Sequence, residues 1–255
     1  MKKEIIDKIL QDTETGYDLV SEKFSGTRKH FWRGLEFIAD YAQDGDKILD
    51  FGCGNGRLLE LFSGKKINYT GLDVSQKLLD LAEKRYAGEN INFAKIAAGQ
   101  SSLPFADEYF NSIYSIAVFH HFPREHAAKM AQELYRITMP GGYVVVTAWN
   151  LWPASTRGGD RSSTRGGQKK YYKNIFKNWL QKLVGQSDLD WNDCLISFQD
   201  NAGRIFQRYH HAFTRGELEK LFTGAGFVVE KRRGTGNRNI LFVGHKAVPK
   251  YRNMV

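Results

Sequence analysis

The feature that most constrains the fold is a regular alternation of short apolar runs and helical segments between residues 46 and 150. The apolar runs are KILDFG (47–52), INYTGLD (67–73), INFAKI (91–96), FNSIYSIAVF (110–119) and GGYVVVTAW (141–149). Helical patterns lie between them at 55–62, 75–87 and 124–138, with Ser75 as a candidate N-cap. Strands that alternate with helices favour a parallel, doubly wound α/β sheet with helices on both faces.

The pattern resumes near the C-terminus. A helix is expected over 214–226, and strands over 227–233 and 238–246 are expected to form a closing antiparallel hairpin around Gly-Thr-Gly-Asn. These two strands bring the expected sheet to seven, most of them parallel. Residues 3–43 are expected to form two helical stretches, because apolar residues recur there at helical spacing.

The segment between these two parts has a different composition. Residues 155–168 read STRGGDRSSTRGGQ, in which Ser-Thr-Arg-Gly-Gly occurs twice, and such a stretch is expected to be a mobile loop. The next residues, KKYYKNIFKNWLQKLVG (169–185), have the spacing of a basic amphipathic helix.

The positive charge is unevenly distributed. Residues 1–150 hold 18 Lys/Arg and 20 Asp/Glu, a balance of −2, whereas residues 151–255 hold 19 and 8, a balance of +11. This asymmetry favours a polyanionic partner, although a solvated basic surface has the same composition. No apolar run of about 18 residues and no apolar leader occur, so neither a membrane span nor a secretory signal is expected. Two cysteines, Cys53 and Cys194, without a CxxC pair, favour a reducing, cytoplasmic compartment.

A glycine-rich turn follows the first apolar run. Gly52, Gly54 and Gly56 let the backbone approach a ligand closely, and the next helix presents free N–H groups there. Asp50 precedes the turn and suits a cationic amino group better than a phosphate. Asp73 ends the second run about 20 residues further on, where a carboxylate can accept both ribose hydroxyls. A nucleotide-binding fold of another kind is the alternative.

These residues resemble the motifs of the class I S-adenosylmethionine-dependent methyltransferases. LDFGCGNG resembles the first motif, GLDVS the second, LPF with FNSIYSIAVFHHF the third and fourth, and LYRITMPGGYVVV the fifth. The resemblance implies a Rossmann-like methyltransferase fold and S-adenosyl-L-methionine as cofactor. The cofactor-contacting residues that it implies are Tyr17, Asp50, Gly52, Gly54, Asp73, Val74, Ser101 and Ile116. Residues 99–102 (GQSS) depart from the family, which often has an acid there near the adenine amino group.

Three further segments resemble a narrower family, the tRNA wobble-uridine carboxymethyl methyltransferases. These are Tyr17-Asp18 with FSGTR (24–28) and Trp32, then SIAVFHHF (115–122), and then RYHHAF (208–213) followed by GEL. The resemblance implies methylation of a carboxylate on a modified uridine. The chain departs from it at TAWN (147–150) and at His210, where the family has the second Tyr of RYYH. Eukaryotic members work with a small zinc-binding activator subunit, and the sequence does not show whether one is needed here.

The implied reaction needs orientation more than acid–base chemistry. A carboxylate with a pKa near ~4 is already ionised at neutral pH, so it needs no general base. Arginine clamps carboxylates through paired N–H bonds, and the candidates are Arg28 and Arg208, each of which could instead form a structural ion pair. Of the adjacent histidines, His120 is expected to face the substrate and His121 to pack.

Other site residues are open to two interpretations. His210 could contact the substrate or satisfy a hydrogen bond in the core, and Tyr17 and Phe24 could cover the cofactor as a lid or belong to the core. The predicted catalytic set is therefore Arg28, His120, Arg208 and His210, and no metal is expected.

The basic segment fits an RNA backbone, because each neutralised phosphate releases counterions. The candidate RNA-binding residues are Arg157, Arg161, Arg165, Lys169, Lys170, Lys173 and Lys177. Interleaved Tyr171, Tyr172 and Trp179 could stack on unpaired bases. A helix with a solvated lysine face and a membrane-surface helix are the alternatives.

Four segments are expected: a helical cap (1–45), the cofactor-binding core (46–150), a basic insertion with its helix (151–202) and the completion of the core (203–255). The expected function is methylation of a 5-carboxymethyl wobble uridine in tRNA. A small-molecule O- or N-methyltransferase and a non-catalytic RNA-binding protein are the alternatives.

Overall fold

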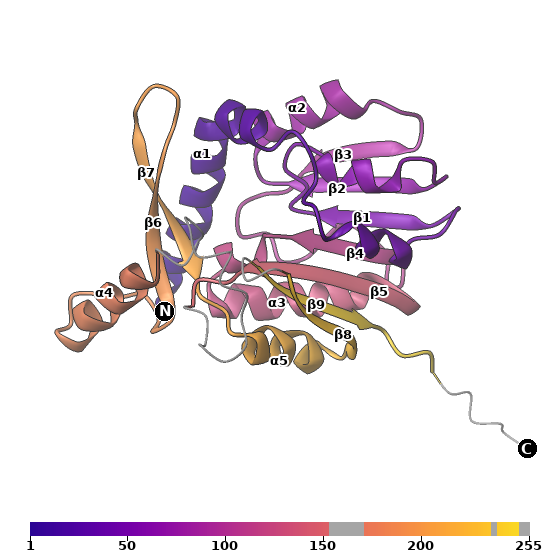
Figure 1. Ribbon diagram of the computed structural model, residues 1–255. Helices are drawn as coiled ribbons and strands as arrows, with labels where there is room; N and C mark the ends of the chain where they lie inside the picture. Colours follow the sequence, from indigo (N-terminus) through magenta and orange to yellow (C-terminus); the bar gives the residue numbers. More distant parts are fainter. Residues whose placement is uncertain (153–170, 236–238, 250–255) are drawn as a thin grey trace, which may run out of the picture.

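The computed structural model describes residues 1–152, 171–235 and 239–249, and a mixed β-sheet forms its centre (Figure 1). Seven strands stand in the spatial order β3-β2-β1-β4-β5-β9-β8. Their bounds are β1 (Lys47–Phe51), β2 (Asn68–Asp73), β3 (Ile91–Lys95), β4 (Phe110–Ile116), β5 (Thr138–Trp149), β8 (Val228–Thr235) and β9 (Asn239–His245). The first five run parallel, and β9 pairs antiparallel with β5 and β8. The predicted α/β class, with its closing hairpin, is confirmed.

Both faces of the sheet are covered, because neighbouring residues of a strand point to opposite sides. Leu49 and Val144 pack in the cluster that contains residues of α3 (Arg124–Ile137) and α5 (Arg215–Ala225). Ile48 and Val145 pack on the other face with η1 (Glu36–Tyr41) and η2 (Arg57–Phe62). Apolar residues at every strand position are typical of such a two-sided sheet.

The helix starts follow from local chemistry. Ser75 caps α2 (Gln76–Tyr86) as predicted, with its Oγ accepting from the Leu78 N–H at 3.3 Å. Thr214 and Glu217 form a capping box at α5. The helix expected over 55–62 is instead the 3-10 segment η2, and Gly56, with φ +73°, delays its start.

A second layer lies beside the sheet (Figure 1). It consists of α1 (Lys3–Thr27), a hairpin of β6 (Asp193–Gln199) and β7 (Ile205–His211), and α4 (Tyr172–Leu183). Gly16 of α1 packs so tightly against β7 that a Cβ there would lie 2.2 Å from the Phe206 ring. The hairpin is therefore held against α1 by close packing.

The expectations for this layer have different outcomes. The two helical stretches expected over 3–43 are one long helix, α1, followed by the 3-10 turn η1. The boundary expected at 202/203 cuts through the β6–β7 hairpin, so only α5, β8 and β9 complete the central sheet after it. The amphipathic helix expected over 169–185 is α4. The loop expected over 155–168 lies outside the described residues.

Strand order also locates the site. From β1 the chain moves outward to β2 and β3 and then returns to β4 on the other side of β1. The carboxyl ends of β1 and β4 thus lie at a topological switch point, where open α/β sheets bind their ligands.

Candidate active site

A cavity of about 860 Å³ opens at this switch point. Its floor is formed by the residues that follow β1, β2 and β4, and its walls by α1, the segment from Arg28 to Phe37 and β7. This volume lies within the range of small-molecule and cofactor sites.

The glycine turn that follows β1 has a left-handed backbone at all three glycines. Gly52, Gly54 and Gly56 all have positive φ, at 78°, 56° and 73°. A Cβ on Gly52 would lie 2.3 Å from Cγ2 of Val118, so the turn fits closely against the end of β4. The Gly54 N–H donates to Asp73 Oδ2 at 2.8 Å, which joins the turn to β2. A side chain at Gly52 would therefore clash as well as strain the backbone.

Two buried carboxyl groups line the cavity floor. Asp50 accepts from the Tyr69 hydroxyl at 2.6 Å, and burial raises its pKa to about 7. Asp73 accepts from the Gly54 and Ser75 N–H groups, and burial raises its pKa to about 6 despite them. Desolvation disfavours a lone buried anion. A cationic or hydroxyl-bearing ligand would relieve that cost.

Hydrogen bonds from Asp18 and Ser25 hold α1 over the cavity. Asp18 accepts from the Ser75 hydroxyl at 2.6 Å and the Lys77 N–H at 3.2 Å, at the start of α2. The Asn55 side-chain amide donates to Ser25 Oγ at 3.0 Å and to the Arg28 carbonyl at 3.2 Å. The segment therefore connects the helix to the glycine turn.

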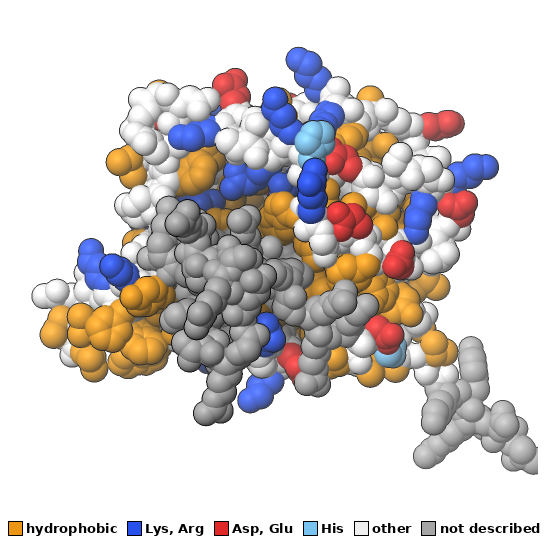
Figure 2. Space-filling model, viewed as in Figure 1, with side chains coloured by type: hydrophobic (Ala, Val, Ile, Leu, Met, Phe, Trp, Pro, Cys, Tyr) orange, Lys and Arg blue, Asp and Glu red, His pale blue; other side chains and the backbone are white. Residues whose placement is uncertain are grey.

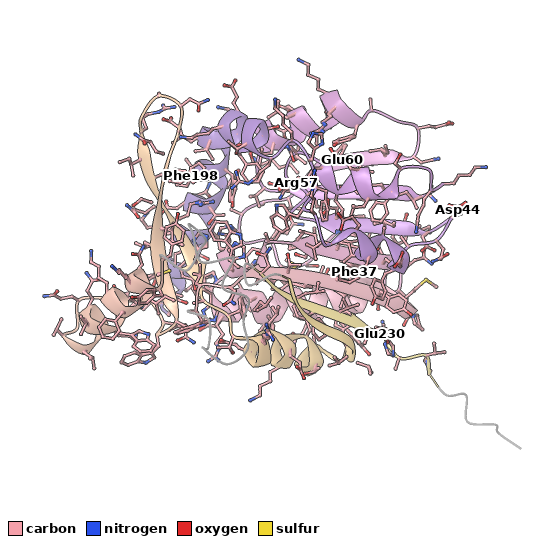
Figure 3. All side chains as sticks on the ribbon, in the orientation of Figure 1. Phe37, Asp44, Arg57, Glu60, Phe198 and Glu230 are labelled. Atoms are coloured by element: carbon pink, nitrogen blue, oxygen red, sulfur yellow. The ribbon has the colours of Figure 1, made fainter. Side chains whose placement is uncertain are left out.

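Four arginines line the same cavity, Arg28, Arg33, Arg57 and Arg208, and Arg33 is the exposed one of them. Burial lowers the pKa of Arg28, and the charge of Arg208 lowers it further. Burial and the neighbouring Arg28 lower the pKa of Arg57 to about 10. Figure 3 labels Arg57, at the start of η2, and Phe198 on the hairpin, whose ring centre is 4.4 Å from the Arg208 guanidinium. Such a concentration of positive charge favours anionic ligand groups.

A short polar chain connects α1, η3 (Phe119–His121) and β7. The Tyr17 hydroxyl lies 2.7 Å from His121 Nε2, and Arg208 Nη1 donates to the same hydroxyl at 3.3 Å. His121 Nδ1 lies 3.1 Å from the Tyr209 carbonyl. Since a carbonyl only accepts, this nitrogen carries the ring proton, and Nε2 accepts from Tyr17. Burial and Arg208 lower the pKa of His121 to about 3, so the ring is neutral.

His120 and His210 stack on each other in the interior, with ring centres 5.1 Å apart. The Trp149 N–H donates to His120 Nδ1 at 3.3 Å, and His210 Nδ1 faces the Arg208 carbonyl at 3.2 Å. Burial lowers the pKa of both rings well below the usual value. With His121 they bring three ring nitrogens within 4.8 Å of one another. The neighbouring Arg208 charge and the Tyr17 bond to His121 disfavour a metal ion there, and we interpret the cluster as neutral packing.

The structure brings most of the predicted residues together. The cavity lining includes the predicted Tyr17, Arg28, Asp50, Gly52, Gly54, Asp73, Val74, Ile116, His120 and Arg208. His210 is fully buried behind His120 and does not line the cavity. Both His120 and His121 line it, and His121, expected only to pack, is the one bonded to Tyr17.

Ser101 lines a second cavity of about 310 Å³ and not the main one, so its predicted cofactor contact stays a prediction. Gly99 and Gln100 line the main cavity. The Gln100 side chain folds back and accepts from the Ala97 N–H at 3.1 Å, which fixes the loop in this register. Arg57, Trp32 and Trp149 were not predicted as site residues. A basic residue directly after a glycine-rich turn is the signal that could have identified Arg57.

The predicted RNA-binding residues Arg157, Arg161, Arg165, Lys169 and Lys170 lie outside the described residues. Lys173 and Lys177 are exposed on α4. Beside them, Tyr172, Phe176, Leu180 and Leu183 are exposed, and Figure 2 shows this apolar surface over α4 at the lower left. Trp179 is partly covered, and its indole N–H donates to the Trp191 carbonyl. The Trp179 ring is therefore less able to stack on an RNA base, whereas the Tyr172 ring is exposed and could do so.

Comparison with known proteins decides the class of this fold. Residues 48–142 match the family model described as a methyltransferase domain. The chain contains a class I S-adenosylmethionine-dependent methyltransferase domain. The domain is an enzyme of the EC 2.1.1 class, and its cofactor is S-adenosyl-L-methionine.

Relatives of the methyltransferase domain carry a more specific name. A protein of Arabidopsis thaliana named tRNA (carboxymethyluridine(34)-5-O)-methyltransferase is 34% identical over 134 residues, 52% of this chain and 31% of that protein. A Schizosaccharomyces pombe protein of the same name is 28% identical over 211 residues, 82% of this chain and 86% of that protein. The chain thus spans under a third of the first relative and most of the second.

Solved structures agree on the fold of the methyltransferase domain. A SAM-dependent methyltransferase of Methanosarcina mazei superposes with a TM-score of 0.62 at 24% identity, covering 86% of this chain and all of that one. A Haloferax volcanii methyltransferase, solved in complex with the Trm112 methyltransferase activator, has a TM-score of 0.62 at 15% identity, covering 94% and 99%. Within the described residues, no helix has the length and apolar character needed to cross a bilayer.

Proposed function

We propose that this domain methylates the carboxylate of a 5-carboxymethyl uridine at the wobble position of tRNA, giving a methyl ester. The observation that carries the proposal is that Arg28 and Arg208 line the cofactor cavity. The names of the relatives and the residues shared with their family support the same substrate.

The cofactor side of the cavity fits S-adenosylmethionine. Asp50 would hold the α-ammonium group, whose charge offsets the cost of burying this carboxylate. Asp73 would accept the ribose hydroxyls, because its oxygens are fixed by the Gly54 and Ser75 N–H groups. Gly52 and Gly54 leave room for the amino-acid end. S-adenosylmethionine, when bound, would supply an electrophilic methyl group, whose transfer to the acceptor oxygen would leave S-adenosylhomocysteine as the neutral thioether.

The acceptor side would orient a carboxylate. Arg208 is held by the Tyr17 hydroxyl and the Phe198 ring, so its guanidinium is positioned before the acceptor binds. Pre-positioned donors lower the barrier by fixing the attack geometry. His121 is neutral and accepts from Tyr17, so it positions this pair and transfers no proton. No base is required, since the attacking carboxylate is ionised at neutral pH.

The tRNA contact is proposed for α4, whose exposed surface combines lysines with apolar and aromatic side chains. Lys173 and Lys177 are exposed there, and Tyr172 and Phe176 lie beside them. Lysines would neutralise backbone phosphates and exposed rings would stack on bases. We extend this interface to the basic residues of 157–170. Removing residues 155–168 should weaken tRNA binding and flatten its salt dependence while cofactor affinity stays unchanged.

An activator subunit is also proposed as a partner. The Haloferax volcanii neighbour was solved with its activator, and it aligns over nearly the whole chain. Methyl transfer should accordingly be measured with and without such a subunit.

The test is a methyl-transfer assay with labelled cofactor on tRNA that lacks the wobble methyl ester, followed by nucleoside mass spectrometry. Label in a base-labile ester of 5-carboxymethyluridine is the expected result. Transfer to a small-molecule acceptor without RNA, and none to tRNA with the activator present, would overturn the proposal. For a variant of Arg208, the matched control is Arg204→Lys, because Arg204 belongs to the same β6–β7 hairpin and pairs with Asp200 at the surface.

A further inference from the structure

We propose that Arg57 binds the α-carboxylate of the cofactor and thereby selects S-adenosylmethionine over analogues that lack this carboxylate. The inference concerns the cofactor alone and holds whichever acceptor is methylated. It rests on the placement of Arg57, its missing counter-ion and its neighbours in the cavity.

Arg57 is a buried cation that faces the cavity. Only 9% of its surface is exposed, and it lines the cavity at the start of η2, directly after the glycine turn. Its guanidinium lies 4.8 Å from the centre of the Trp32 ring. Stacking on an aromatic face holds the planar group while its N–H edges stay available for a planar anion.

Within the described residues, no carboxylate lies within ion-pair distance of this guanidinium. Arg57 forms no ion pair and no side-chain hydrogen bond among the contacts of the described chain. The nearest acidic side chain in η2, Glu60, is occupied by Arg85 at 2.6 Å and by the Phe31 N–H at 2.9 Å. Buried charges are normally paired, and a ligand carboxylate would complete this one.

The cavity also contains a carboxyl group, Asp50, which could bind the ammonium group of the same amino acid. Asp50 and Arg57 are close enough to affect each other's pKa, yet they form no ion pair within 4.0 Å. An α-amino acid carries an ammonium and a carboxylate on one carbon. A separated carboxylate and guanidinium therefore match it, each binding the group of opposite charge.

Arg28 and Arg208 are less suited to this role. Arg28 is only partly buried, stacks on Phe24 and donates to Thr27 Oγ1 at 2.9 Å. Arg208 lies on β7 and bonds to Tyr17, far along the chain from the glycine turn. Arg33, the fourth arginine of the lining, is exposed to solvent. Arg57 alone of the four directly follows the turn that would hold the amino-acid end.

The experiment is calorimetric titration, without tRNA, of S-adenosylmethionine and of decarboxylated S-adenosylmethionine, which differ only in the carboxylate. The wild-type protein should bind the first about 30-fold more tightly. Arg57→Met should lose most of this preference, mainly through weaker binding of S-adenosylmethionine. Arg28→Gln tests whether the neighbouring guanidinium shares this role, and it should keep the preference. Arg215→Gln, on the exposed surface of α5 away from the cavity, is the matched control.

Further arms keep the test decisive if Arg57→Met does not fold. Trp32→Leu should reduce the preference a few-fold by freeing the guanidinium, and Arg57→Lys should keep part of it. Equal affinity of the wild-type protein for the two compounds would overturn the inference. So would an unchanged preference in folded Arg57→Met, or its loss in Arg28→Gln. None of these outcomes bears on the tRNA substrate, because no acceptor is present.

Discussion

The two walls of the cavity are constructed in different ways. On the cofactor side, Asp50, Gly54 and Asp73 lie within 24 residues of sequence, on adjacent strands and the turn between them. On the acceptor side, Tyr17 contacts His121 across 104 residues and Arg208 across 191. The first wall belongs to the central sheet, whereas the second is assembled from α1, η3 and the hairpin.

This difference predicts that substitutions can impair cofactor binding and acceptor binding separately. Bonds between adjacent parallel strands form together with the sheet, so the cofactor wall persists as long as the sheet does. The acceptor wall also needs α1 to dock, which depends on Asp18, Ser25 and the close contact of Gly16 with the hairpin. Variants of the first wall should therefore alter cofactor binding, and variants of the second should spare it.

The largest effect is expected from Asp73→Ala. It removes the acceptor of the Gly54 and Ser75 N–H groups together with the proposed ribose contact. Loss of charge-assisted hydrogen bonds should lower cofactor affinity about 100-fold. Calorimetry measures this loss, with Asp44→Ala as a control on the exposed far side of the sheet (Figure 3). Near-normal affinity in a folded variant would refute the assigned role.

Arg208→Lys should break only the acceptor wall. Lysine keeps the charge but loses the planar fork that binds a carboxylate and packs on Phe198. Turnover of tRNA should fall about 30-fold, while cofactor affinity stays within about twofold. Steady-state kinetics and calorimetry on the same preparation separate the two quantities. A parallel loss of both would mean that the walls are not independent.

The pH dependence of cofactor binding should sharpen the comparison. Burial raises the pKa of Asp50 to about 7, so the empty protein holds this carboxyl largely protonated at pH 5.5. A group whose folded-state pKa is raised above the unfolded value near ~3.9 makes the empty protein less stable as pH rises through that window. The ammonium group of the cofactor needs the ionised form.

Cofactor affinity should therefore rise roughly tenfold from pH 5.5 to 7.5. Asp50→Asn should bind more weakly at pH 7.5 and lose most of this dependence. Titrations at several pH values check both statements. A flat profile in the wild-type protein would show that Asp50 does not ionise on binding.

The smallest effect is expected from Tyr17→Phe. It removes one hydroxyl that links His121 and Arg208 and leaves the ring against Phe24. The net value of such a hydrogen bond predicts about a fivefold loss of turnover, with cofactor affinity unchanged. Thermal unfolding of the variant serves as the control for α1 docking. An effect on cofactor affinity larger than on turnover would place Tyr17 on the cofactor wall.

Prediction from sequence succeeded where the chemistry is local. The strand and helix pattern, the Ser75 cap and the place of the glycine turn after β1 follow from residues close in sequence. It was less successful over 99–101, where a side-chain bond of Gln100 sets the register and moves Ser101 out of the main cavity. The β6–β7 hairpin was also missed; it forms a two-stranded sheet of its own that packs against α1 and does not continue the alternating pattern of the central sheet.

The sequence by itself determined the sheet, its order of elements and the cofactor turn, because periodicity and glycine content act within one strand–turn–helix unit. It also identified Arg28, Arg208 and the histidine pair as candidates. Only the tertiary structure decided which of them meet: His121 rather than His120 bonds to Tyr17, His210 is buried behind them, and Arg57 faces the cavity without a counter-ion among the described residues. Such contacts join segments up to 191 residues apart, and their partners are fixed by packing that no local pattern encodes.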